Sequence, residues 1–215
     1  MSNVPLLAWM GGTFDPVHNG HLRIALDVVE QLGCERLSLL PCADPPHGKT
    51  PLADAQQRSQ LLELAVEGVT ELQVDKRELQ RGGESYTVDT LRELREENPE
   101  AALCWVMGGD SFASLRSWSR WEEIFTLTHL VVCQRPEAVF FDGLEPALQS
   151  EWQARATTDV SELRQVLAGK ILPVTPTQLS ISATEIRRRL QEGRSVRYLV
   201  PTAVANWLEE QPAYK

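Results

Sequence analysis

The stretch LLAWMGGTFDPVHNGHLRIALDVVEQL, residues 6–32, decides the fold. It begins with the apolar run Leu6–Met10, which has the length of a buried strand, and continues through a turn with two glycines. From His18 to Leu32 the apolar side chains recur at the spacing of one helix face. A strand, a glycine-rich turn and an amphipathic helix in this order predict a chain of alternating strands and helices.

The same alternation continues through the rest of the chain. Further strands are predicted over 36–40, 72–79, 103–107, 130–134 and 170–174, and helices over 55–66, 87–97, 182–191 and 202–210. Shorter helical segments are predicted at 121–125, near 144–156 and at 161–167. This pattern indicates a doubly wound, Rossmann-like α/β fold with a mostly parallel sheet and helices on both faces. We expect a single domain over residues 1–215, with a C-terminal helical part at about 182–215.

Composition and charge exclude several classes of protein. The 215 residues are 42% hydrophobic and 24% charged, which is ordinary for a globular protein and excludes disorder and coiled coil as the main state. No apolar run approaches the roughly 18 residues that span a bilayer. The net charge of −9 provides no overall basic field for a nucleic-acid backbone. We therefore expect neither a membrane nor a nucleic acid as partner.

The cysteines indicate the compartment. Cys34, Cys42, Cys104 and Cys133 form no CxxC pair and no metal-type spacing, so we expect reduced thiols and no protein-held metal. The N-terminal residues also lack the basic start and cleavage site of a signal peptide. A cytoplasmic location is expected.

The first candidate site is the loop Gly11–His21. Ligands of doubly wound sheets bind beyond the carboxyl ends of the strands, and Gly11 and Gly12 would let the backbone approach one closely. His18 and His21 share one face at a helix start, where free amides and the helix dipole favour phosphate. The loop matches neither the GxGxxG fingerprint nor a P-loop, which disfavours a dehydrogenase and an ordinary P-loop NTPase.

A second candidate segment, ISATEIR at 181–187, opens another predicted helix. Ser182 can cap that helix, and Thr184 adds a hydroxyl group. Arg187 adds a forked cation that suits phosphate oxygens.

These two motifs resemble those of a known superfamily. GTFDPVHNGH at 12–21 resembles the signature of the HxGH-type nucleotidylyltransferases, and 181–187 resembles their ISxTxxR motif. The middle of the chain is similar to the bacterial nicotinate-nucleotide adenylyltransferases. The segments that carry this similarity are PPH at 45–47, SYTVDTL at 85–91, GGDS at 108–111 and LRSWSRW at 115–121. The resemblance extends over about residues 5–205.

The resemblance implies that ATP and nicotinate mononucleotide give nicotinate adenine dinucleotide and pyrophosphate, a late step of NAD synthesis. A phosphate monoester is already nucleophilic near neutral pH, so direct in-line attack needs no general base and no covalent intermediate. Catalysis would then be positioning and charge neutralisation. His18, His21 and Arg187, with Mg²⁺ carried on ATP, would stabilise the charge that moves to pyrophosphate.

The resemblance also implies binding roles. The ATP-binding residues would be Gly11, Gly12, Thr13, Phe14, Gly108, Asp110, Ile181, Ser182 and Thr184. The mononucleotide-binding residues would be His47, Lys49, Tyr86, Thr87, Trp118 and Arg135. Backbone amides near Tyr86 and Thr87 would receive the nicotinate carboxylate, and Trp118 would stack on the pyridine ring. Family members often have a lysine directly after PPH, whereas Gly48 intervenes here, so either His47 or Lys49 could meet the substrate phosphate.

Several alternatives stay open. The acceptor could be nicotinamide mononucleotide or phosphopantetheine, and a non-catalytic nucleotide-sensing module is an alternative of another class. A class I aminoacyl-tRNA synthetase shares a similar loop but is disfavoured by the short chain and the net charge of −9. A homo-oligomer is possible, and the Pro-rich loop 41–51 could act as a lid.

Overall fold

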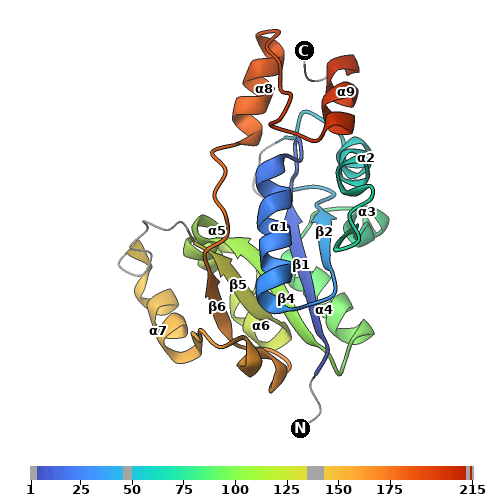
Figure 1. The fold of residues 1–215 in the computed structure, drawn as a ribbon. Helices are drawn as coiled ribbons and strands as arrows, with labels where there is room; N and C mark the ends of the chain where they lie inside the picture. The colour runs from blue at the N-terminus through green and yellow to red at the C-terminus, as the bar shows by residue number, and fades with distance from the viewer. Residues whose placement is uncertain (1–3, 46–49, 135–142, 212–213, 215) are drawn as a thin grey trace.

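A computed structural model describes residues 4–45, 50–134, 143–211 and 214. In this part of the chain, parallel strands form one six-stranded sheet in the order β3-β2-β1-β4-β5-β6 (Figure 1). The strands are β1 Leu6–Gly12, β2 Leu37–Pro41, β3 Leu72–Val74, β4 Ala102–Gly108, β5 His129–Cys133 and β6 Ile171–Val174. The α/β Rossmann-like prediction is confirmed. Strand order reverses between β1 and β4, which opens a crevice at their carboxyl ends.

Helices cover both faces of this sheet (Figure 1). They are α1 Asn19–Leu32, α2 Ala55–Val66, α3 Arg77–Arg81, α4 Thr87–Glu97, α5 Gly109–Ala113, α6 Trp121–Leu127, α7 Pro146–Arg155, α8 Ala183–Gln191 and α9 Thr202–Glu210. Two 3₁₀ segments, η1 Leu115–Ser117 and η3 Val160–Arg164, complete the described elements.

Alternate residues of the strands build two separate cores. Ala8 and Met10 of β1 pack with α1, α2 and the C-terminal helices. Trp9 and Trp105 point to the other face and pack with α4, α5 and α6. Successive side chains of a strand point to opposite faces of the sheet, and both faces are buried here. Successive positions of β1 and β4 are therefore apolar, and not only every second one.

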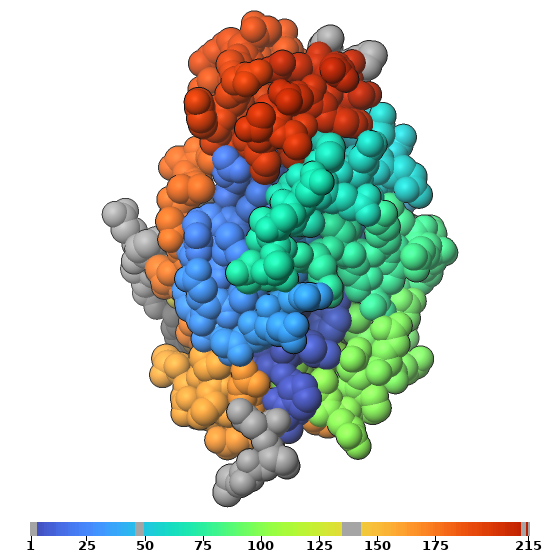
Figure 2. Space-filling view, turned by 45° about the vertical axis from the view of Figure 1, so that its right-hand side comes forward, coloured from blue at the N-terminus to red at the C-terminus, as the bar shows by residue number. Residues whose placement is uncertain are grey.

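The C-terminal helices extend the fold beyond the carboxyl ends of the strands. α8 and α9 lie at one end of the molecule, and Figure 2 shows α9 against α2. Ile186 and Leu208 are fully buried in the core shared with α1. The loop between α8 and α9 is tied to the start of α1, because Asn19 donates its backbone N–H to the Leu199 carbonyl at 2.9 Å.

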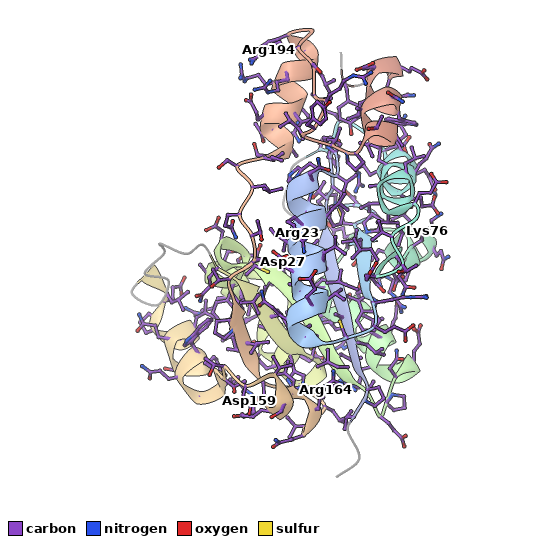
Figure 3. The ribbon with its side chains drawn as sticks, in the orientation of Figure 1. Arg23, Asp27, Lys76, Asp159, Arg164 and Arg194 are labelled. Carbon is purple, nitrogen blue, oxygen red and sulfur yellow. The ribbon has the colours of Figure 1, made fainter. Side chains whose placement is uncertain are left out.

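Charged side chains fix the connections around α1. Asp27 accepts a hydrogen bond from Arg23 Nε at 2.7 Å and one from the Thr177 N–H at 2.6 Å. Figure 3 shows Arg23 and Asp27 on α1 beside the segment that leads from β6 to α8. At the other end of α1, Arg164 donates to the Leu32 and Gly33 carbonyls, which a helix C-terminus leaves without partners.

The sequence prediction for 72–79 is wrong beyond Val74. Asp75 accepts a hydrogen bond from the Arg77 N–H at 3.0 Å, and this local turn ends β3 and starts α3. The helix predicted at 161–167 is the 3₁₀ segment η3, opened by an Asp159 carboxylate that accepts from the Ser161 N–H at 2.8 Å. No helix among the described residues is long and apolar enough to cross a membrane.

Gly11 is required by the packing of β1 against β4. A Cβ at Gly11 would lie 2.6 Å from Trp105 Cζ2, closer than real Cβ contacts allow. At Gly12 a Cβ would lie 3.0 Å from Phe14 Cζ. The sequence interpretation, in which these glycines admit a ligand, is therefore incomplete, because aromatic rings of the chain itself occupy the space.

We expect Gly11→Ala to lower the free energy of unfolding by about 1–3 kcal/mol, since the methyl group overpacks against Trp105. Urea denaturation measures this loss. Gly108→Ala is the matched control, because nothing lies within 4 Å of its Cβ position. In a Trp105→Phe background the loss should shrink, and an equal loss in both backgrounds would rule out the contact as the cause.

Candidate active site

A cavity of about 690 Å³ opens at the carboxyl ends of β1 and β4, where the strand order reverses. Its lining includes nine residues that the sequence proposed for binding or catalysis. These are Gly11, Gly12, Thr13, Phe14, His21, Tyr86, Thr87, Gly108 and Trp118. Segments far apart in the sequence thus meet in one hollow, as the doubly wound architecture predicts.

The loop after β1 forms one wall. Phe14 is buried and has a left-handed backbone with φ of 50°, an uncommon conformation for a residue with a side chain. Its ring meets the His21 ring edge-on, with 5.1 Å between centroids. The loop therefore holds the His21 imidazole against a fixed apolar surface.

His18 and His21 cap helix α1 reciprocally. His18 Nδ1 accepts from the His21 N–H at 3.4 Å, and His21 Nδ1 accepts from the His18 N–H at 3.3 Å. The two rings stack with 3.7 Å between centroids. This pair uses two of the backbone N–H groups that the sequence interpretation left free for phosphate.

Both histidines are neutral near pH 7. Burial lowers the pKa of His18 to about 4. Burial and the adjacent His18 ring lower the pKa of His21 to about 3. Because each Nδ1 accepts a backbone N–H, the proton of each neutral ring must sit on Nε2. His21 lines the cavity and can donate there, whereas His18 stacks behind it.

The start of α8 lies beside the start of α1. A Cβ at Gly20 would lie 3.7 Å from the Ile181 carbonyl oxygen. Arg187 Nη1 donates to the Asp15 main-chain carbonyl at 2.6 Å, and Arg187 Nη2 donates to Thr184 Oγ1 at 3.3 Å. Arg187 keeps 28% of its side chain exposed, so its guanidinium can still receive an anion at the edge of the loop.

Other proposed residues lie away from the lining. Ser182 uses its hydroxyl to cap α8, where it accepts from the Glu185 N–H at 3.2 Å. Ile181, Thr184 and Asp110 are likewise outside the cavity lining, and Asp110 lies in the first turn of α5. The remaining mononucleotide residues, His47, Lys49 and Arg135, fall outside the described part of the chain.

The opposite wall is the start of α4. Tyr86 occupies the cap position and makes no side-chain capping hydrogen bond, and its hydroxyl donates to Glu84 at 2.6 Å. The positive end of α4 therefore faces the cavity through Thr87. Trp118 follows η1 and is half-buried against the second core.

Sequence reasoning missed two charged residues of the site. Arg58 is 1% exposed, and its guanidinium donates to main-chain carbonyls of the loops after β1 and β2. Glu78 is 4% exposed, lines the cavity and has a pKa raised by burial. An arginine in a helix and a glutamate in a charged stretch resemble surface residues, so the sequence carried no signal for either burial.

Among the described residues, no group of three or more His, Cys, Asp or Glu side chains is arranged to hold a metal ion. The cysteines in this part of the chain are free thiols, and burial raises the pKa of Cys42 and Cys133 at the cavity.

Comparison with known proteins identifies the family. A family model described as cytidylyltransferase-like matches residues 9–189. The chain belongs to the cytidylyltransferase-like family. Within it, the chain is 44% identical to a probable nicotinate-nucleotide adenylyltransferase of Methylococcus capsulatus, over 95% of this chain and 97% of that protein. It is 46% identical to the Pseudomonas aeruginosa protein of the same name, over 95% of each chain.

Solved structures share the fold of this chain. The Plasmodium falciparum nicotinic acid mononucleotide adenylyltransferase complexed with NaAD superposes with a TM-score of 0.73, at 14% identity over 98% of this chain and 97% of that one. A putative nicotinate-nucleotide adenylyltransferase from Vibrio parahaemolyticus gives a TM-score of 0.64 at 17% identity, over 98% and 95%. The resemblance that the motifs carried is confirmed.

We expect both imidazoles to be neutral with the proton on Nε2 at pH 7, and to titrate at about 4 for His18 and about 3 for His21. Long-range ¹H–¹⁵N correlation spectra across a pH series measure tautomer and midpoint together. A His18→Asn variant assigns the signals. Because the unfolded histidines protonate near pH ~6.5, acidification from there towards pH 4 should destabilise the fold. A midpoint near ~6.5 would contradict the effect of burial on the two rings, and an Nδ1–H tautomer would contradict the capping geometry.

Proposed function

We propose that this cytidylyltransferase-like protein transfers the adenylyl group of ATP to nicotinate mononucleotide, releasing pyrophosphate and nicotinate adenine dinucleotide. The observation that carries the proposal is the composition of one cavity. One wall presents the His21 ring and the loop Gly11–Phe14, and the other presents an open helix start and Trp118. The first wall offers hydrogen-bond donors, which suit the phosphates of the adenylyl half. The second wall offers the open helix start and a flat aromatic ring, which suit the carboxylate and the pyridine ring of the nicotinate half.

The reaction needs charge stabilisation rather than proton transfer. A phosphate oxygen of the mononucleotide attacks the α-phosphorus of ATP, and the bond to the oxygen that bridges α- and β-phosphorus breaks. The attacking oxygen is already anionic, so no residue has to remove a proton. His21 Nε2–H and the Arg187 guanidinium would meet the charge that builds on pyrophosphate. Mg²⁺ carried on ATP would neutralise further phosphate charge.

The mononucleotide half follows from the second wall. The uncapped N–H groups at Thr87 can donate to the nicotinate carboxylate, and the helix dipole favours that anion over a neutral amide. Trp118 can stack on the pyridine ring, a contact worth about 1–3 kcal/mol by analogy with base–aromatic stacking. His47, Lys49 and Arg135 stay predictions for the mononucleotide phosphate. The cytoplasmic location and a homo-oligomer also stay predictions.

We expect rapid pyrophosphate release with ATP, Mg²⁺ and nicotinate mononucleotide, because the α4 terminus favours the carboxylate. Nicotinamide mononucleotide and phosphopantetheine are offered in parallel, and an EDTA arm tests the need for Mg²⁺. Preference for either other acceptor would overturn the assignment of Thr87 and Trp118. Binding of ATP without release of pyrophosphate from any acceptor would favour a nucleotide-sensing module.

Two substitutions at His21 test the roles of its two ring nitrogens separately. Asn places an acceptor near the Nδ1 position and keeps the cap on the His18 N–H, but has no donor at the Nε2 position. Gln places a donor near the Nε2 position. We expect His21→Asn to lower kcat about 10²-fold or more while the fold stays intact, and His21→Gln to lose less. Steady-state kinetics and circular dichroism measure both effects, and a variant with Asn that retains full kcat would remove His21 from the chemistry.

A further inference from the structure

Asp15 is a buried carboxylate that the proposed transfer reaction does not use. It follows Phe14 in the loop after β1 and is 6% exposed. Its two carboxylate oxygens accept from the Leu52 N–H at 2.8 Å and the Ala53 N–H at 3.3 Å. A buried charge of this kind is stable only while its oxygens keep enough donors.

Tyr214 supplies a further donor from the far end of the sequence. Its side chain is fully buried, and its hydroxyl donates to Asp15 Oδ1 at 2.5 Å. The ring packs edge-on against Trp207 of α9, with 6.4 Å between centroids. Burial and the Asp15 carboxylate raise the pKa of Tyr214, so the hydroxyl remains a donor throughout the physiological range.

Asp15 also meets the Arg187 guanidinium. The Asp15 main-chain carbonyl accepts from Arg187 Nη1 at 2.6 Å, while Asp15 Oδ2 lies 3.8 Å from the same nitrogen. The close contact is therefore with the neutral carbonyl, and the carboxylate holds only a loose ion pair. This leaves much of the positive charge of Arg187 available to a substrate anion.

We propose that Asp15 and Tyr214 are positioning residues, which hold Arg187 and the loop after β1 in the arrangement that receives the ATP phosphates. The proposal rests on the proposed adenylyl transfer at this site. Without the Tyr214 hydroxyl, Asp15 Oδ1 keeps only the longer bond from Ala53, and the nearest cation is Arg187. The carboxylate then draws the guanidinium towards itself and away from phosphate.

Tyr214→Phe tests this directly, because it removes the hydroxyl and keeps the ring packed on Trp207. We expect kcat/KM for ATP to fall about 10-fold, as for the loss of a hydrogen bond to a charged group, with KM for nicotinate mononucleotide unchanged. Tyr198→Phe is the matched control, since its side chain is 92% exposed. A Tyr214→Phe enzyme that only loses thermal stability, with kcat/KM for ATP at the wild-type value, would overturn the proposal.

A double-mutant cycle tests whether Tyr214 acts through Arg187. We expect Tyr214→Phe to have little further effect on kcat/KM for ATP in an Arg187→Ala background. Full additivity of the two changes would contradict a route through Arg187.

Calorimetric titration with ATP alone separates this proposal from the proposed function. If the wild-type protein releases no pyrophosphate, the proposed adenylyl transfer is wrong. The positioning role is then judged by ATP affinity, which should be about 10-fold weaker in Tyr214→Phe and unchanged in Tyr198→Phe. Equal ATP affinity in wild type and Tyr214→Phe would overturn the positioning role whatever the outcome for turnover.

Discussion

The cavity depends on the buried guanidinium of Arg58. This side chain donates to the Thr13 carbonyl at 2.7 Å, the Cys42 carbonyl at 2.8 Å and the Ala43 carbonyl at 3.1 Å. Thr13 and Cys42 belong to the loops after β1 and β2, so one residue of α2 ties these two loops together at the cavity. A lysine could not replace it, because an ammonium group cannot span carbonyls on two loops in a fixed plane. The five donors of arginine make this buried cation tolerable, since four of them reach main-chain oxygens and the fifth reaches Cys42 Sγ.

A second set of polar contacts holds the first loop at Asp15. Asp15 accepts from the Tyr214 hydroxyl at 2.5 Å, and its main-chain carbonyl accepts from Arg187 at 2.6 Å, so these three residues form one connected polar cluster. Strands position the backbone of the loop, but they do not fix the side chains that follow Gly12. The polar cluster performs that task through Asp15, and the His18–His21 capping pair performs it at the helix start. Rigidity of this kind is what catalysis by positioning requires.

The sequence predicted what depends on local periodicity and on contiguous motifs. The bounds of α2 and α4, and the meeting of the loops after β1 and β4, follow from apolar spacing and doubly wound topology. Arg58 and Tyr214 were missed because their burial depends on carbonyls and a carboxylate far away in the chain. The start of α3 was missed because residues 75–79 were predicted to continue the strand. In the structure the Asp75 carboxylate accepts from the Arg77 N–H, and this turn ends the strand. Long-range polar contacts leave no periodic trace in a single sequence.

The three helix starts at the site differ in how their amides are used, and this difference separates two kinds of anion recognition. At α1 and α8, His18 and Ser182 occupy the cap positions and accept backbone N–H groups themselves. At α1 this capping also fixes each histidine proton on Nε2, so an imidazole N–H is available there as a side-chain donor. At α4 no side chain caps the helix, so its amides stay open to a planar carboxylate. The helix start at α4 therefore differs from those at α1 and α8, because it alone of the three has no side chain that accepts a hydrogen bond at its cap position.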